Sequence, residues 1–150
     1  MNITYEATPR KATPADFGGI IRLLQASQLP TGDLSSDLPH FFVIEKDGEI
    51  IASAGVEIYR NLGLIRSVAV DEDYRKRSLA TILLDRLMSY VSVQQITALY
   101  LITTTAERYF AQKGFHSVNR DKVPAPIALS SEFTTICPST AIVMMKELPQ

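Results

Sequence analysis

The sequence contains one cysteine, Cys137, and two histidines among its 150 residues. A single cysteine excludes an internal disulfide and any metal site built from several thiolates. His40 and His116 stand far apart and show no spacing typical of metal ligands. We therefore expect no metal site.

The chain also lacks a charge excess and long apolar runs. It carries 15 Lys+Arg against 16 Asp+Glu, which argues against a dedicated nucleic-acid binder. No apolar run approaches the roughly 20 residues that a membrane helix needs. The N-terminal residues MNITYEATPRK show neither a signal-peptide core nor a cleavage pattern. We expect one cytoplasmic domain over residues 1–150, without a membrane partner.

The most informative segment runs from Leu64 to Leu87. An apolar strand, Leu64–Val70, is followed by an acidic turn, by the basic residues Arg75–Ser78 and by a helix with one apolar face. The first turn of a helix carries unpaired N–H groups and a partial positive charge. Cations placed just before it make an anion site suited to a phosphate or pyrophosphate. The alternative is a strand, a solvated basic turn and an ordinary amphipathic helix.

The remaining elements follow from periodicity, caps and turn residues. A helix begins at Thr13-Pro14, with Asp16 in its first turn. Gly18-Gly19 weakens that helix, and indicates either close packing or a segment that shifts when a ligand enters. Asp47-Gly48 predicts a hairpin, and Gly114 a helix end. Strands are predicted at Ile3–Thr8, His40–Glu45, Ile50–Tyr59, Ala98–Thr103, from Phe115 and at Thr140–Met145, a second short helix at Ala106–Lys113, and a helical turn at Ser131–Ile136.

Three motifs of the sequence resemble those of a known protein family. They are SVAVDEDYRKRSLA at Ser67–Ala80, AERYFAQKGF at Ala106–Phe115 and ATPADF at Ala12–Phe17. In these the chain resembles the GNAT superfamily of acetyl-coenzyme A (acetyl-CoA) dependent N-acetyltransferases. The resemblance implies an α/β GNAT (acyl-CoA N-acyltransferase) fold. In that fold a mixed, mostly antiparallel sheet of about six to seven strands has helices on both faces and a splayed central strand pair.

A narrower resemblance concerns the substrate. LPTGDL at Leu29–Leu34, YLITTTAERYF at Tyr100–Phe110 and FTTICPSTA at Phe133–Ala141 are similar to the arsenic-resistance N-acetyltransferases. This implies a small amine acceptor that resembles an amino acid, such as an organoarsenical. Arsenic(III) prefers several thiolates, so we interpret Cys137 as a small apolar residue rather than a metalloid ligand.

The resemblance also implies where the cosubstrate acetyl-CoA binds. The family's pyrophosphate motif reads Arg or Gln, two residues, Gly, one residue, then Gly or Ala, and Arg75 matches its first position. The backbone of Val68 and Val70 would pair with the pantetheine arm, and an N–H near Val68 would polarise the thioester carbonyl. The residues implied in cosubstrate binding are Val68, Ala69, Val70, Arg75, Lys76, Arg77, Ser78, Leu79, Ala80, Thr103 and Phe110.

Three of these positions depart from the family pattern. Ser78 replaces the usual glycine, Thr103 a common asparagine, and Phe110 the tyrosine that serves as the family's acid. Tyr109 stands one position earlier and points about 100° away on a helix. The departing thiolate would then take its proton from water, or the substrate would compensate.

Residues on the acceptor side follow from the chemistry. A neutral amine would attack the thioester directly and needs a proton acceptor. Glu57 is the best candidate base, although it also fits a surface glutamate at a strand end. Arg66 interrupts an apolar strand, so it either pairs with a carboxylate such as Glu57 or holds an anionic substrate. Thr31 and Asp33 are expected to border the same pocket; Asp33 either holds the substrate ammonium or caps its own turn.

Two other functions stay open at this stage. The departures at Ser78, Thr103 and Phe110 also suit a catalytically degenerate relative that binds coenzyme A (CoA) as a sensor or partner protein. An enzyme that acetylates proteins is the third alternative. The resemblance leaves room for a homodimer.

Overall fold

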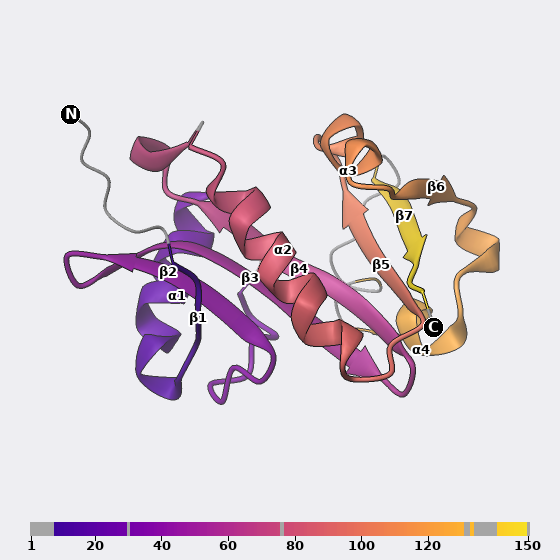
Figure 1. The fold of residues 1–150 in the computed structure, drawn as a ribbon, viewed down its shortest axis with the longest axis horizontal. Coiled ribbons are helices and arrows are strands. Elements are labelled where there is room, and N and C mark those ends of the chain that lie inside the picture. The colour runs from indigo at the N-terminus through magenta and orange to yellow at the C-terminus, as the bar shows by residue number, and fades with distance from the viewer. Residues whose placement is uncertain (1–7, 30, 76, 131–132, 134–140, 150) are drawn as a thin grey trace. The chain divides into compact units, whose positions relative to one another are not determined.

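A computed structural model describes residues 8–29, 31–75, 77–130, 133 and 141–149 (Figure 1). The strands are β1 Arg10–Lys11, β2 Phe41–Lys46, β3 Glu49–Tyr59, β4 Leu62–Val70, β5 Ala98–Thr103, β6 His116–Val118 and β7 Ile142–Glu147. The α-helices are α1 Phe17–Ala26, α2 Leu79–Ser92, α3 Glu107–Gln112 and α4 Ala125–Ala128, and the 3₁₀ turns are η1 Pro14–Asp16, η2 Glu72–Tyr74 and η3 Arg120–Lys122. No helix in these ranges is long and apolar enough to span a membrane.

The strands form one seven-stranded sheet in the order β1-β2-β3-β4-β5-β7-β6. The pairs β1–β2, β2–β3, β5–β7 and β6–β7 are antiparallel, whereas β4 and β5 are parallel. The predicted mixed, mostly antiparallel sheet of about six to seven strands is thus confirmed. The chain divides into a first unit, Met1–Val56 with Ser67–Tyr90, and a second unit, Glu57–Arg66 with Val91–Gln150. A single domain over residues 1–150 stays a prediction.

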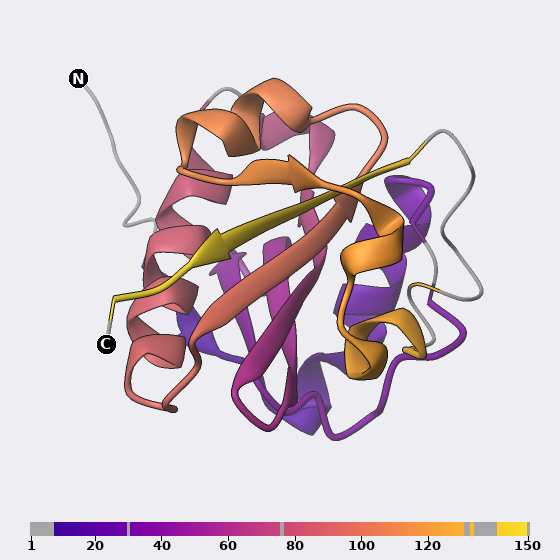
Figure 2. The ribbon, with the colours of Figure 1, turned by 90° about the vertical axis from the view of Figure 1, so that its right-hand side faces the viewer.

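In the first unit, α1 and α2 lie on opposite faces of the strands (Figure 2). Alternation along β2 explains this arrangement, because successive strand residues point to opposite faces. Phe41 and Val43 pack in one buried cluster with Ile20 and Leu24 of α1. Phe42, between them in sequence, points the other way and contacts Tyr90 of α2 edge-on, with ring centroids 5.2 Å apart.

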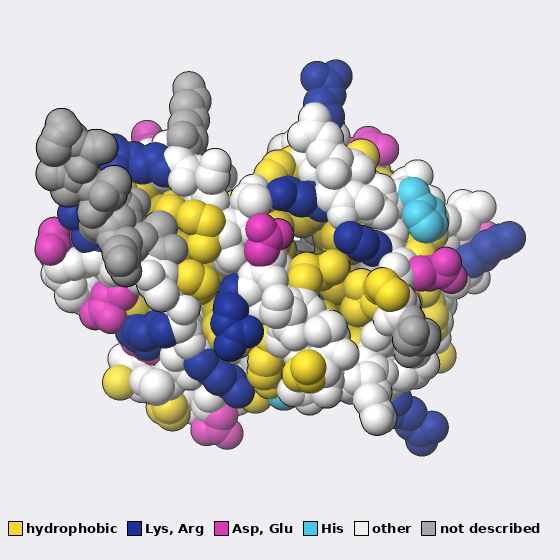
Figure 3. Space-filling model, in the orientation of Figure 1, with side chains coloured by type: hydrophobic (Ala, Val, Ile, Leu, Met, Phe, Trp, Pro, Cys, Tyr) yellow, Lys and Arg dark blue, Asp and Glu magenta, His cyan; other side chains and the backbone are white. Residues whose placement is uncertain are grey.

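Cations cover aromatic rings on the α2 face of this unit. Figure 3 shows Lys and Arg side chains among hydrophobic ones in this region. The Arg86 guanidinium lies 4.6 Å from the Phe42 ring centroid, and the Lys11 ammonium 4.9 Å from that of Tyr90. Such cations close an apolar surface while their charged ends stay near water.

The first helix begins as the cap residues predict. The Thr13 amide donates to the Asp16 carboxylate over 2.8 Å, and Pro14 occupies the first position of η1, which leads into α1. Arg10 forms an ion pair with the same carboxylate at 2.9 Å. At Gly19, an added Cβ would lie 2.9 Å from Ile50 Cγ1. Of the two interpretations of Gly18-Gly19, Gly19 therefore supports close packing of α1 on β3.

In the second unit, β5, β7 and β6 pack around a separate buried cluster that includes Leu64, Tyr100, Ile127 and Val143. The α3 helix ends where predicted, because Gly114 adopts a left-handed φ of 96°. The α4 helix was not predicted. Its Ile127 side chain is fully buried and anchors it in the cluster.

Two predicted elements fall largely or wholly beyond the described residues. Of the strand predicted at Ile3–Thr8, only Thr8 is described, and it lies outside any strand. The turn predicted at Ser131–Ile136 is described only at Phe133. The Asp47-Gly48 hairpin is confirmed, with φ of 53° and 83° at the two residues, as a two-residue primed turn requires.

Candidate functional site

The strand β4 contains a backbone irregularity within the predicted cosubstrate segment. Ser67 has a φ of 58°, an unusual value for a non-glycine strand residue and one found in certain β-bulges. Its carbonyl accepts a 2.8 Å hydrogen bond from the Ser53 hydroxyl on β3, and Ser53 is fully buried. The local bend is thus held from inside the first unit, immediately before Val68.

Beyond Ser67 the strand alternates in the ordinary way. Ala69 is buried in the α1 cluster, whereas Val68 and Val70 are half-buried. The described pairing of β4 with β5 joins Leu62–Leu64 to Ala98–Tyr100. Residues 67–70 belong to the first unit and β5 to the second. The splay of these strands, and the pantetheine contacts of Val68 and Val70, stay predictions.

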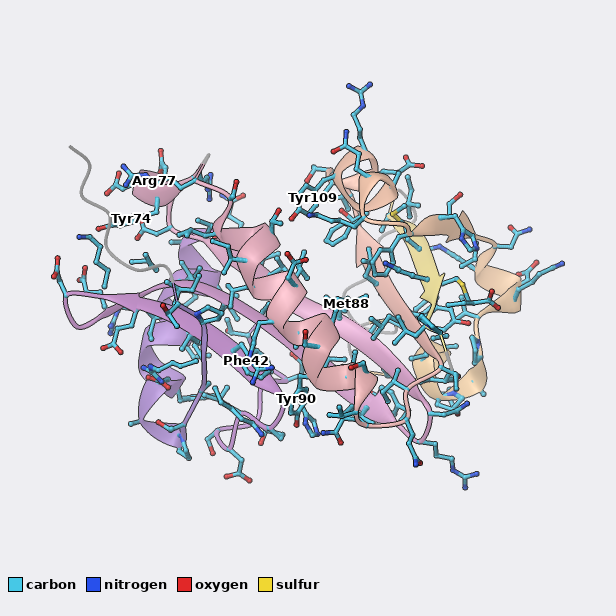
Figure 4. All side chains as sticks on the ribbon, in the orientation of Figure 1. Phe42, Tyr74, Arg77, Met88, Tyr90 and Tyr109 are labelled. Carbon is cyan, nitrogen blue, oxygen red and sulfur yellow. The ribbon has the colours of Figure 1, made fainter. Side chains whose placement is uncertain are left out.

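The turn after β4 is built by its own side chains. The Asp71 carboxylate accepts a 2.9 Å hydrogen bond from the Asp73 amide and caps η2. The Arg75 Nε donates to the Val70 carbonyl over 3.1 Å, so Arg75 folds back against the end of β4. The Arg77 guanidinium lies 5.4 Å from the Tyr74 ring centroid (Figure 4). Lys76 lies outside the described residues.

Ser78 sets the start of α2. It is exposed and has a left-handed φ of 62°, a conformation that glycine adopts more readily than serine. Its carbonyl accepts the Ile82 amide at 3.0 Å, the first bond of the helix ladder. Leu79 then turns into the core with 2% exposure, and Ala80 is half-buried.

This arrangement suits an anion. α2 is 14 residues long, so its first turn presents amide N–H groups and the positive end of a substantial helix dipole. Arg75 and Arg77 add exposed positive charge in the turn before it. Residues from Arg75 to Ala80 therefore have the chemistry to hold the phosphates of a nucleotide-like molecule.

A second polar cluster lies in the second unit, around Arg66 on β4. Arg66 is only 4% exposed, and its Nη1 donates to the Glu57 Oε2 over 2.8 Å. The carboxylate pairing that was one interpretation of Arg66 is thus present. The Glu57 side chain is 28% exposed, so it is not fully enclosed by the protein.

Sequence reasoning missed two members of this cluster, Tyr59 and Ser130. The Tyr59 hydroxyl donates to the Glu57 Oε1 over 2.6 Å. Burial raises the pKa of Tyr59 well above its usual range, and the hydrogen bond to Glu57 raises it further. The Ser130 hydroxyl beside the same phenol lowers the pKa of Tyr59, against these two effects. The Glu57–Tyr59 spacing was an available signal, because strand residues two apart share a face.

Thr103 and Phe110 have clear structural roles. The Thr103 hydroxyl oxygen accepts a 2.9 Å hydrogen bond from the Ala106 amide, at the entry to α3. Phe110 is 6% exposed and packs edge-on against Phe115, with ring centroids 5.7 Å apart. Tyr109 is half-buried, and the Lys113 ammonium lies 5.6 Å from its ring centroid (Figure 4). A cosubstrate contact at Thr103 or Phe110 stays a prediction.

The other predicted acceptor residues, Thr31 and Asp33, belong to the first unit. Both are half-buried, and the Thr31 carbonyl accepts the Leu34 amide at 3.1 Å. Their place beside Arg66 stays a prediction. Cys137 lies outside the described residues. Within the described ranges, no group of three or more metal-ligating side chains forms a metal site.

The sheet order and the strand–turn–helix unit define the class to which this chain belongs, that of acyl-CoA N-acyltransferase folds. The model of the Acetyltransferase (GNAT) family matches residues 12–116. The chain belongs to the GNAT family, as the motifs implied.

Curated proteins and solved structures similar to this chain are acetyltransferases or CoA complexes. The amino-acid acetyltransferase of Escherichia coli K12 is 28% identical over 124 residues, and that of Mannheimia succiniciproducens 30%. Each match covers 77% of this chain but 28% of the relative, so the chain spans little more than a quarter of those proteins. Among solved structures, N-acetylglutamate synthase from Neisseria gonorrhoeae, complexed with coenzyme A and N-acetyl-glutamate, has a TM-score of 0.82 at 18% identity, covering 99% of this chain and 36% of that one. A Mycobacterium tuberculosis protein in complex with CoA has a TM-score of 0.79 at 20% identity, covering 95% and 99%.

Proposed function

We propose that this protein transfers the acetyl group of acetyl-CoA to the amine of a small, amino-acid-like acceptor. The observation that carries the proposal is the β4–turn–α2 unit. There a left-handed Ser78 starts a 14-residue helix directly after two exposed arginines. Family membership supports the acetyl donor, and the names of the curated relatives support the amino-acid-like acceptor.

The donor half of the site would use the first unit. The amides at the start of α2, with Arg75, Lys76 and Arg77, would hold the pyrophosphate. The backbone of Val68, Ala69 and Val70 would receive the pantetheine arm, and the Val68 N–H would polarise the thioester carbonyl as negative charge develops on it. The bend at Ser67 supports this role, because it interrupts regular strand geometry just before Val68.

The acceptor half would use the polar cluster around Glu57. The amine nitrogen attacks the thioester carbon, so a C–N bond forms, the C–S bond breaks and the sulfur leaves as thiolate. Glu57 takes the proton that the amine loses, directly or through one water molecule. The thiolate takes a proton from water, since Phe110 is a buried phenylalanine at the position of the family's tyrosine acid. Arg66, Thr31 and Asp33 would border the acceptor.

Two sources suggest which small molecule accepts the acetyl group. An organoarsenical amino acid is the acceptor implied by LPTGDL at Leu29–Leu34 and YLITTTAERYF at Tyr100–Phe110, and the curated relatives point to ordinary amino acids. The organoarsenical and the ordinary amino acids should therefore be compared as acceptors in one assay. A homodimer stays a prediction.

The test is release of free CoA thiol from acetyl-CoA across a panel of amino acids, an arsenical amino acid and lysine peptides. We expect turnover on at least one small acceptor and a fall of about 10²-fold in kcat for E57Q, a typical contribution of general base catalysis. The matched control is E49Q, at an exposed glutamate on the same strand, which should keep wild-type kcat. Activity on peptides alone would contradict the small-acceptor proposal.

Two observations favour a second candidate function, that of a CoA-binding sensor or partner protein. Phe110 is packed against Phe115, and the Thr103 hydroxyl serves the start of α3. Phe110 has no hydroxyl proton to give in place of the family's tyrosine. A rise in Tm with CoA, together with no thiol release on any amine, would select this function over the transferase.

A further inference from the structure

Both carboxylate oxygens of Glu57 accept a hydrogen bond from a protein side chain. The Arg66 Nη1 donates to Oε2 over 2.8 Å, and the Tyr59 hydroxyl donates to Oε1 over 2.6 Å. Both distances lie in the range of charge-assisted hydrogen bonds, which are stronger than neutral ones. All three side chains lie in the second unit. A glutamate with several rotatable bonds is thereby restricted to one orientation.

The two donors differ in what holds them. Arg66 is nearly fully buried within β4, so its guanidinium has little freedom. Tyr59 lies on β3, two residues after Glu57, and packs against the cluster of Leu64, Tyr100 and Ile127. The Ser130 hydroxyl lies beside that of Tyr59. The Ser130 hydroxyl donates to the Ile127 carbonyl over 2.7 Å, which fixes Ser130 against α4.

We propose that Tyr59 is a positioning residue for Glu57 and that the segment from Ile127 to Ser130 supports it. This inference rests on the proposed function, in which Glu57 accepts the proton of the attacking amine. The phenol holds one oxygen while Arg66 holds the other, and each carboxylate oxygen has a second lone pair with which to meet the amine or its water. A base held in one orientation needs no reordering when the acceptor arrives.

The decisive variant is Y59F, which keeps the ring in the core and removes only the hydroxyl. We expect kcat to fall about tenfold, with the KM for acetyl-CoA unchanged, because one hydrogen bond to a charged group is lost and the base is less well oriented. The matched control is Y100F, which removes a hydroxyl from another buried tyrosine of the same cluster. It should keep wild-type kcat. S130A should produce a smaller fall than Y59F.

The double variant E57Q/Y59F separates positioning from a general structural effect. If Tyr59 acts through Glu57, adding Y59F to E57Q should lower kcat no further, since residues that act as a unit are not additive. A further tenfold fall in the double variant would overturn the inference. The Tm of each variant shows whether a loss of rate reflects unfolding.

The outcomes distinguish this inference from the proposed function. Wild-type kcat in Y59F, with E57Q impaired, would overturn the positioning role and leave the transferase intact. Wild-type kcat in E57Q would overturn the base assignment and with it the role of Tyr59. A raised KM for the acceptor with kcat unchanged in Y59F would show that Tyr59 binds substrate, and would also overturn the inference.

Discussion

Two serines with left-handed backbones flank the segment that the family uses for its donor. Ser67 and Ser78 have φ of 58° and 62°, values that glycine adopts far more readily than serine. The sequence showed only that Ser78 departs from a glycine pattern. The structure shows that Ser78 has a backbone conformation that glycine reaches without strain, to which serine adds a side chain.

At Ser78, replacement by glycine should improve donor binding. S78G removes an exposed side chain from the loop and relieves a left-handed conformation that costs roughly 1–2 kcal/mol in non-glycine residues. Glycine's larger unfolded-state entropy offsets about 0.5–1 kcal/mol of that gain in the free energy of unfolding. We expect the Kd for CoA, measured by calorimetry, to fall by up to about tenfold, equivalent to 1.4 kcal/mol.

The control for this variant is Q95G. Gln95 also has a φ of 62° and is exposed, but it follows the other end of α2. Q95G should change the unfolding free energy by a similar amount and leave the Kd for CoA unchanged. A Kd for S78G equal to or higher than that of the wild type would show that the serine itself contacts the phosphates.

For Arg66, the sequence predicted a carboxylate partner but not the hydroxyl groups nearby. An arginine inside an apolar strand requires a partner, and that much followed from its burial alone. Glu57 was a named candidate, and the ion pair exists. Tyr59 was missed although its spacing from Glu57 was an available signal. Ser130 was missed because a hydroxyl far away in sequence has no signal comparable to that of a buried charge.

At the scale of elements, local signals were reliable. The Thr13-Pro14 start, the Asp47-Gly48 hairpin and the Gly114 helix end all lie where short-range chemistry placed them. β5 was predicted with its observed bounds, because Ala98–Thr103 is a short apolar run between polar turns. The α4 helix was missed, since four residues with a proline carry no helical periodicity.

The junction between β2 and α2 contains a partly buried histidine, His40, that makes stability depend on pH. His40 Nδ1 lies 2.5 Å from the Tyr90 hydroxyl oxygen, and the Lys11 ammonium donates to the same oxygen over 3.4 Å. Burial lowers the pKa of His40, and the charge of Lys11 lowers it further. The unfolded chain, with a histidine pKa of about 6.5, therefore binds a proton more readily than the folded protein.

The sign of the effect follows from this difference. The stability that neutral His40 contributes is fully present above the unfolded pKa and is lost as the pH falls below it, through the lowered folded value. We expect the unfolding free energy, from urea titrations, to fall between about pH 7.5 and about pH 5, and the fall to be smaller in H40Q. H116Q, at an exposed histidine, serves as the control. An unchanged dependence in H40Q would contradict the prediction.

For the whole molecule, the question is whether the two units unfold together. We predict that they do, because we expect residues 1–150 to form a single domain. One cooperative domain should give the slowest amides of β2 and of β5 the same opening free energy in hydrogen exchange. Acetyl-CoA at about 100 times its Kd should raise both values by about 2.7 kcal/mol. Clearly lower protection in one unit would show that the units unfold separately.

Short-range chemistry was sufficient for most strands and helices, for the caps and for the turns, because these depend on residues within a few positions of one another. The family followed from the same local motifs. The place of Ser130 beside Tyr59 needed the folded chain, because Ser130 reaches this cluster only once α4 has packed against the strands. Contacts between residues far apart in sequence depend on packing and register, which no local pattern records.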